Sequence, residues 1–120
     1  MESYEMAKLH FEKLGASPEG QQELCKFNEV MQFNVKDDES FYIEIKGGKA
    51  TVTNGVSTAD PKKVISLTLD KATVREIFQK GQLYPGLADF MFSGKLWLKA
   101  PKTGDKPSTA WAAKLLRMHV

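Results

Sequence analysis

One stretch, residues 64–98, restricts the possible folds of this chain more than any other. Apolar and polar residues alternate over 64–69, the period-two pattern of a strand with one buried face. A short helix should follow, because Thr73 and Glu76 have the spacing of a capping box. Gly81 should end this helix, since glycine readily adopts the left-handed conformation found beyond a helix end. The stretch therefore begins as a strand followed by a helix.

An apolar crossover should come next and lead into a second strand. Residues 83–92 are richer in large apolar side chains than their neighbours, and Gly94 then turns the chain into alternating residues. This order of elements resembles the sterol carrier protein type-two domain. The likeness is carried by Ile65 to Leu69 and by Gly81, Leu83, Pro85, Phe90, Met91, Ser93, Gly94, Lys95 and Leu96. The preceding hairpins and the closing helix fit the order of elements in that family, so the resemblance covers residues 24–120.

Local patterns predict the remaining elements. Three further alternating runs predict strands at 31–35, 41–46 and 50–54. Gly47 and Gly48 should make a tight reversal between the last two. A first helix is expected over 2–14 and ends at Gly15, and a second begins with Ser17 as its N-cap. The predicted class is α+β, a mostly antiparallel five-stranded sheet covered on one face by helices.

A chain of 120 residues is expected to form one domain, residues 1–120. Its parts would be amino-terminal helices in 1–27, the sheet and crossover in 28–99, and a closing helix at 108–119. The chain is 42% hydrophobic and 27% charged, an ordinary composition for a globular protein. A single cysteine cannot form an internal disulfide, and no signal peptide or long apolar run appears. A cytoplasmic location is therefore expected.

The net charge of +2 is unevenly distributed. Residues 94–120 hold six bases against one acid, whereas the first 93 residues hold eleven bases against fourteen acids. The basic carboxyl end is either a solvated surface or a contact for anionic membrane, where each cation near the surface contributes about 1 kcal/mol. Nucleic acid is not an expected partner, because the bases are not interleaved with stacking aromatic residues.

Residue types that support catalysis are sparse. His10 and His119 are the only histidines and lie at opposite ends of the chain, so a metal site is not expected. Cys25 has no base near it in the sequence and is expected to be a small buried hydrophobic residue. Asp37 and Asp38 lack calcium-loop spacing and are expected to lie in a polar turn. The sequence therefore predicts no enzyme and no cofactor.

An excess of large apolar residues is the remaining functional signal. Those expected to line a lipid-binding tunnel are Phe78, Leu83, Leu87, Phe90, Met91, Trp111 and Leu115. Composition alone does not distinguish a lined cavity from a filled core. The resemblance favours the cavity, since domains of that family hold sterols or fatty acyl chains between sheet and helices. A closing helix would then move to admit the ligand.

Trp97 is expected to point away from the core. It alternates with Leu96 and Leu98 and shares its face with Lys95 and Lys99. An amphipathic ring among lysines suits a lipid headgroup boundary or a subunit contact. Lys95, Trp97 and Lys99 are thus the expected membrane or partner contact, and a homodimer is one of the partners left open.

The function expected from sequence is non-catalytic binding and transfer of an apolar lipid, which the resemblance identifies as a sterol, a fatty acid or a fatty acyl-CoA. The alternative is an interaction or dimerisation module, or the accessory scaffold domain of an enzyme, with the same fold and a filled core. A hydrolase of lipid esters is a third hypothesis, disfavoured because no catalytic triad is apparent.

Overall fold

The computed structural model describes residues 2–26, 28–59, 64–78, 92–99 and 115–116. The described elements, in chain order, are α1 (Glu2–Ala16), α2 (Pro18–Leu24), β1 (Val30–Val35), β2 (Phe41–Lys46), β3 (Lys49–Asn54), β4 (Val64–Leu69), α3 (Lys71–Phe78) and β5 (Leu96–Lys99). Leu115 and Leu116 are helical and buried. The predicted stop at Gly81, the crossover at 83–91 and the cap of the closing helix at Ser108 lie outside the described residues.

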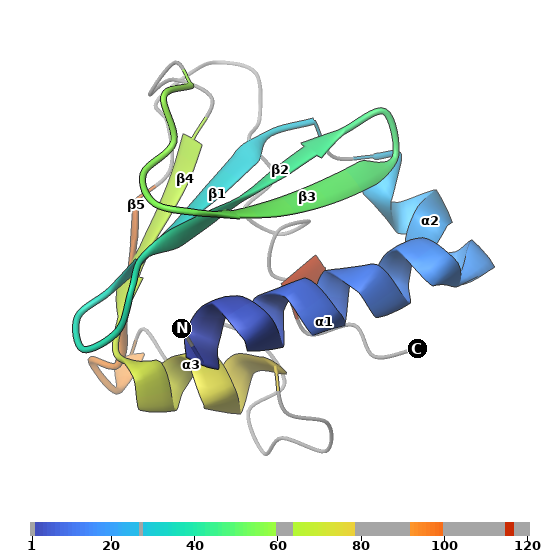
Figure 1. Ribbon diagram of the computed structural model, residues 1–120. Helices are drawn as coiled ribbons and strands as arrows, with labels where there is room; N and C mark the ends of the chain where they lie inside the picture. Colours follow the sequence, from blue (N-terminus) through green and yellow to red (C-terminus); the bar gives the residue numbers. More distant parts are fainter. Residues whose placement is uncertain (1, 27, 60–63, 79–91, 100–114, 117–120) are drawn as a thin grey trace.

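The strands form one five-stranded sheet in the order β3-β2-β1-β4-β5. Only the central pair, β1 with β4, is parallel; the other three pairs are antiparallel. Helices α1 and α3 lie against the same face of this sheet (Figure 1). The predicted α+β class and the mostly antiparallel sheet are therefore confirmed. The two-residue reversal between β2 and β3 is also confirmed, since Gly47 and Gly48 both have positive φ, 60° and 78°.

The core lies between the sheet and the helices. In β1, β2 and β4 every second side chain points to the helical face and is buried, as the alternation predicts. The largest fully buried side chains are Phe33, Phe41, Leu14, Leu24, Met31, Ile43, Ile45, Ile65, Leu67 and Leu69. Because these residues come from the sheet and from both amino-terminal helices, their burial holds the two layers together.

The outer face of the sheet carries one buried polar residue that the alternation does not reveal. Gln32 is only 4% exposed. Its Nε2 donates to the carbonyl oxygens of Phe41 and Gly55, both at 3.1 Å, and its Oε1 accepts from the Ser57 amide at 2.8 Å. The Gln32 amide thus holds the segment after β3 against this face with its hydrogen bonds satisfied.

The helix ends agree only partly with the sequence predictions. Ser17 is the N-cap of α2, as expected, and accepts from the Gly20 amide. The capping-box prediction for α3 is wrong: Asp70 is the cap, and its Oδ1 accepts from the Thr73 amide at 2.8 Å and the Thr73 hydroxyl at 2.6 Å. Asp70 directly precedes the first helical residue, so its carboxylate lies beside the unpaired amides of the first turn, whereas Thr73 is already inside the helix. Gly15 does not end α1, which continues to Ala16.

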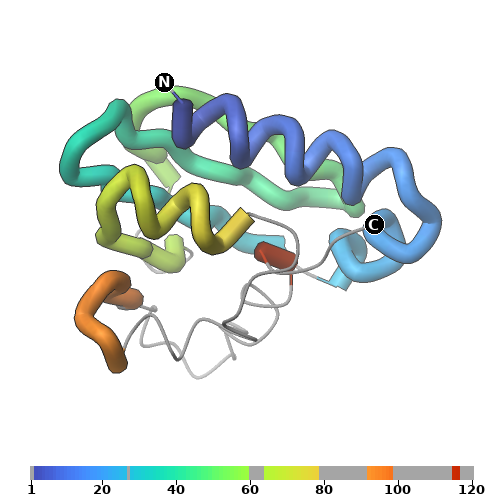
Figure 2. Tube along the Cα trace, turned by 90° about the horizontal axis from the view of Figure 1, so that it is seen from below, coloured from blue at the N-terminus to red at the C-terminus, as the bar shows by residue number. Residues whose placement is uncertain are grey.

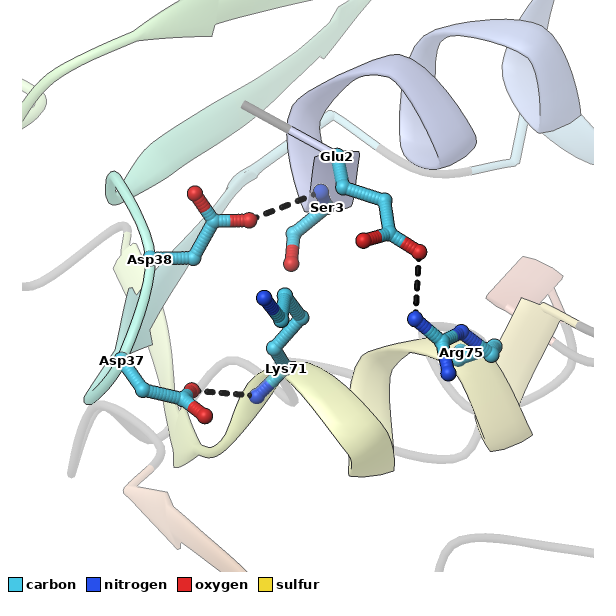
Figure 3. A network of polar contacts seen from close by, with 6 residues as sticks. All are labelled: Glu2, Ser3, Asp37, Asp38, Lys71 and Arg75. Carbon is cyan, nitrogen blue, oxygen red and sulfur yellow. Dashed lines mark hydrogen bonds and ion pairs between the residues drawn. The ribbon is translucent and has the colours of Figure 1, made fainter.

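Asp37 and Asp38, in the turn between β1 and β2, bind the starts of two helices (Figure 3). Asp38 accepts from the Ser3 amide of α1 at 3.0 Å, and Asp37 accepts from the Lys71 amide of α3 at 2.7 Å. A helix start has unpaired N–H groups and a partial positive charge, so carboxylates stabilise it. This acidic turn, Asp37 and Asp38, therefore ties the sheet to α1 and α3 at one end of the molecule.

Candidate functional site

Aromatic rings from three elements meet in the layer between the helices and the sheet. His10 and Phe11 come from α1, Phe33 from β1 and Phe78 from the last residue of α3. Ring centroids lie 4.9 Å apart for His10 and Phe78, 6.4 Å for Phe11 and Phe78, and 6.0 Å for Phe33 and Phe78. Together with Leu115, these four residues are called the His10 cluster below.

His10 connects this cluster to the carboxyl-terminal part of the chain. Its side chain is 7% exposed, and Nε2 lies 2.7 Å from the Leu115 carbonyl oxygen. A carbonyl oxygen only accepts, so Nε2 carries the proton and donates it. Figure 2 shows residues 115–116, in red, close to the end of α3. Two parts of the chain that are 105 residues apart are thus joined by a buried hydrogen bond.

Two of the seven predicted tunnel residues lie in the His10 cluster. Phe78 is 8% exposed and Leu115 is fully buried, and both contact His10. The other five, Leu83, Leu87, Phe90, Met91 and Trp111, lie outside the described residues. The structure thus brings together a residue from the helix before the crossover and one from the predicted closing helix.

An open groove of about 500 Å³ lies beside the cluster, between the end of α1 and the β2–β3 turn. It is lined by Phe11, Glu12, Gly15, Gln21, Gly47, Gly48, Lys49 and Ala50. The Gln21 Nε2 donates to the Gly48 carbonyl oxygen at 2.8 Å and holds the turn against α2. Phe11 lines the groove and also belongs to the His10 cluster, so the two adjoin at this side chain.

Cys25 lies at the same end of the molecule, and the prediction that it is buried is wrong. Its thiol is exposed, and a Cβ added at Gly48 would lie 2.6 Å from its Sγ. The reason is the position of Cys25 as the C-cap of α2, one residue beyond the buried Leu24. The helix turns Leu24 toward the core and leaves the next side chain at the surface.

The predicted contact residues follow the length of β5: Lys95 precedes the strand, Trp97 lies within it and Lys99 is its last residue. Trp97 is 72% exposed, as expected for its outward face, and Phe92, just before the strand, is 89% exposed. Lys95 forms an exposed ion pair with Glu76 of α3, with Nζ to Oε2 at 3.4 Å. The backbone of Lys99 ends the strand. Phe92 and Trp97 together are called the β5 aromatic pair below.

Comparison with solved structures agrees with this topology. A UbiJ-SCP2 ubiquinone synthesis protein superimposes with a TM-score of 0.62 at 14% identity, over 82% of this chain and 81% of that one. Apo sterol carrier protein 2 from Yarrowia lipolytica gives a TM-score of 0.58 at 19% identity, over 95% and 86% of the two chains. This chain has the sterol carrier protein type-two fold. No protein-family model and no curated protein matches the sequence.

The sterol carrier protein type-two fold also occurs inside a larger protein. The stereoselective inverting sec-alkylsulfatase Pisa1 from Pseudomonas sp. matches 78% of this chain with a TM-score of 0.56 and 16% identity. The match covers only 14% of that enzyme's length. The fold is therefore found both as most of a chain and as a small part of one.

Among the described residues, no three His, Cys, Asp or Glu side chains are placed to hold a metal ion. No described helix is long and apolar enough to cross a membrane. Two pKa shifts lie outside the His10 cluster: burial raises the pKa of the Glu29 carboxyl, and the Thr73 hydroxyl and amide lower the pKa of Asp70.

The sequence prediction missed His10 as a member of the site, although a signal was present. His10 follows Ala7 by three residues and precedes Leu14 by four, so it shares the apolar stripe of α1. A histidine on that stripe must be buried and needs a hydrogen-bond partner. Its partner, the Leu115 carbonyl, comes from the far end of the chain and has no local sequence signal.

Proposed function

We propose that this protein binds an apolar lipid non-covalently and transfers it, without catalysing a reaction. The observation that carries the proposal is the meeting of Phe78 and Leu115 at His10, between the helices and the sheet, in a fold shared with a sterol carrier protein. The proposed lining also includes the five predicted residues of the crossover and closing helix. A sterol, a fatty acid and a fatty acyl-CoA are the candidate ligands.

Binding would be driven by the transfer of the lipid chain out of water. Burial of apolar surface contributes about 25 cal/mol per Å², so an alkyl chain needs few polar contacts for useful affinity. The groove bounded by Phe11 is the proposed entrance, because it opens to solvent and touches the His10 cluster. Among the described residues, Cys25 is exposed and His10 is buried and engaged with Leu115, so the proposal gives neither a catalytic role.

The alternative function is a scaffold or dimerisation domain with a filled core. One observation favours it specifically: the same fold makes up a small part of an alkylsulfatase, so it can serve within a larger assembly. In that case Phe78 and Leu115 would be packing residues, and the β5 aromatic pair would contact a partner chain or a second copy.

Lipid exchange would take place at a membrane surface, and the proposed contact is Lys95, Trp97 and Lys99. The β5 aromatic pair would supply the apolar part of this contact. Since Lys95 is paired with Glu76, most of the attraction to anionic lipid should come from the other bases of residues 94–120. A cytoplasmic location is part of this proposal.

The test is native mass spectrometry of the freshly purified protein, followed by denaturing extraction of any bound molecule. We expect a lipid at about one per chain, either co-purified or taken up from vesicles. A ligand-free mass that stays unchanged after exposure to vesicles and acyl-CoA would reject the proposal. A dimer mass in the same spectrum would support the alternative.

A further inference from the structure

We propose that the His10 imidazole and the Leu115 carbonyl together form the headgroup site of the lipid, and that they recognise a hydroxyl group. This inference rests on the proposed function, because it places the polar end of the ligand at one point of the same site. It assigns a role to a buried titratable residue that lipid-chain binding alone leaves unused.

The pair offers one donor and one acceptor. Nε2–H of His10 donates to the Leu115 carbonyl oxygen at 2.7 Å, and both groups are buried. A ligand that enters between them must replace the hydrogen bond on each side, since an unsatisfied buried polar group is costly. A hydroxyl does so, because its oxygen accepts from Nε2–H while its proton goes to the carbonyl oxygen.

The space required is small. Two hydrogen bonds of about 2.8 Å would replace one, so the imidazole and the carbonyl must separate by about 2 Å. Rings of Phe11 and Phe78 flank His10 and leave the alkyl or sterol body of the ligand in apolar surroundings.

A carboxylate fits this pair less well than a hydroxyl. It can accept from Nε2–H but has no proton for the Leu115 carbonyl, so two acceptor oxygens would face each other. Burying an ionised carboxylate is also expensive in apolar surroundings. An ether oxygen accepts from His10 but likewise has nothing to donate. The predicted order of affinity is therefore alcohol above both the ether and the carboxylate.

The experiment compares hexadecanol, its methyl ether and hexadecanoate as competitors of one fluorescent lipid, bound to the full chain. We expect hexadecanol to bind about tenfold more tightly than the ether, the usual loss for one unsatisfied buried hydrogen bond. Hexadecane, which neither donates nor accepts, is the fourth probe. In His10→Phe the ether should bind no more tightly than hexadecane, because the N–H donor to its oxygen is lost, whereas the alcohol still donates to the Leu115 carbonyl and keeps its advantage over the ether. In His10→Gln, which keeps an N–H donor, the ether should remain tighter than hexadecane.

The ratio of ether to hexadecane affinity separates the role of His10 from a structural one. If the His10–Leu115 bond only fastens the chain, His10→Phe will weaken both of these ligands alike and leave their ratio unchanged, which overturns the inference. Equal binding of all three probes by the unmodified chain overturns it as well, while the proposed function stands. Failure of all three to bind overturns both.

A second measurement avoids any dependence on the folding of His10→Phe. In protein labelled with ¹³C and ¹⁵N, the Nε2 resonance of His10 should shift on addition of either hexadecanol or the methyl ether. The Leu115 carbonyl carbon should keep the shift of a hydrogen-bonded carbonyl only with hexadecanol, because only the alcohol replaces both hydrogen bonds. A Leu115 carbonyl that responds identically to the two ligands overturns the inference.

Discussion

The two ends of the sheet are built in opposite ways. At the β1–β2 end, the acidic turn binds the starts of α1 and α3 through Asp38 and Asp37. At the β2–β3 end (Figure 1), Gly47 and Gly48 form the turn, and Gly48 packs against α2. An open groove lies beside this turn and is lined in part by Phe11. Hydrogen bonds from backbone amides to side-chain carboxylates fasten the first end, and close backbone approach shapes the second. The difference favours a stabilising role for the acidic end, and the glycine end is the proposed site of ligand access.

The largest effect is expected from Gly20→Ala at the glycine end. A Cβ at this position of α2 would overlap the carbonyl oxygen of Leu14 in α1. The two helices would have to separate, at a cost of about 2 kcal/mol of unfolding free energy in urea titrations. The matched control is Gly15→Ala, which has open space around its Cβ and should gain about 0.5–1 kcal/mol. An equal loss of unfolding free energy in Gly20→Ala and Gly15→Ala would show that the close approach of Gly20 to the Leu14 carbonyl does not limit stability.

The next effect is expected from removing the acidic turn. The double variant of Asp37→Ala and Asp38→Ala loses one backbone acceptor at each of two helix starts. Each lost cap costs about 1 kcal/mol, so the unfolding free energy should fall by about 2 kcal/mol. Glu39→Ala, in the same turn and exposed, is the control and should change stability by less than about 0.5 kcal/mol. A stability equal to that of the control would show that the turn does not fasten this end.

A smaller, pH-dependent effect is expected at the cap of α3. The Thr73 hydroxyl and amide lower the pKa of Asp70 in the folded state, so the ionised form stabilises the fold. This contribution is complete above the ordinary carboxyl pKa and is lost as the pH falls through the lower, folded-state value. The stability difference between the unmodified chain and Asp70→Asn should thus be constant from about pH 7 to 5 and shrink below about pH 4. If the stability difference between the two proteins grew as the pH fell, the folded state would not favour ionised Asp70, and this prediction would be wrong.

The smallest effect on stability is expected at the β5 aromatic pair. Trp97→Ser and Phe92→Ser remove exposed rings and should each change the unfolding free energy by less than about 0.5 kcal/mol. Together they should weaken association with anionic vesicles in sedimentation assays. Val56→Ser, which removes an apolar side chain of 72% exposure elsewhere, is the control. Vesicle association that is unchanged in the double variant would exclude the pair from membrane contact.

The sequence predicted the positions of strands and helices better than it predicted which strands pair and which residue caps a helix. The alternation at Ile65, Leu67 and Leu69 correctly identified a strand and its buried face, because side-chain direction has a fixed period of two. That period does not say which strands pair, so the parallel contact of β1 with β4 was not predicted. The cap of α3 was assigned to Thr73 because the capping-box spacing is local, whereas Asp70 occupies the position nearer the free amides.

The site was less predictable than the fold. Phe78 was identified from its helical stripe, and Trp97 from its place between two inward leucines. The role of Asp37 and Asp38 was not predicted. The amides of Ser3 and Lys71 that donate to these carboxylates lie far from them in the sequence. The same holds for His10, whose partner is 105 residues distant. Long-range hydrogen bonds leave no periodic signal.

An internal lipid site is tested most directly by intermolecular NOEs between a bound ¹³C-labelled sixteen-carbon lipid and the protein. We expect NOEs from the lipid chain to the Phe78 ring and to the Leu115 methyl groups, in the layer between helices and sheet. NOEs confined to Phe92 and Trp97 would place the lipid on the surface instead. That result would contradict an internal site and leave the fold as a scaffold.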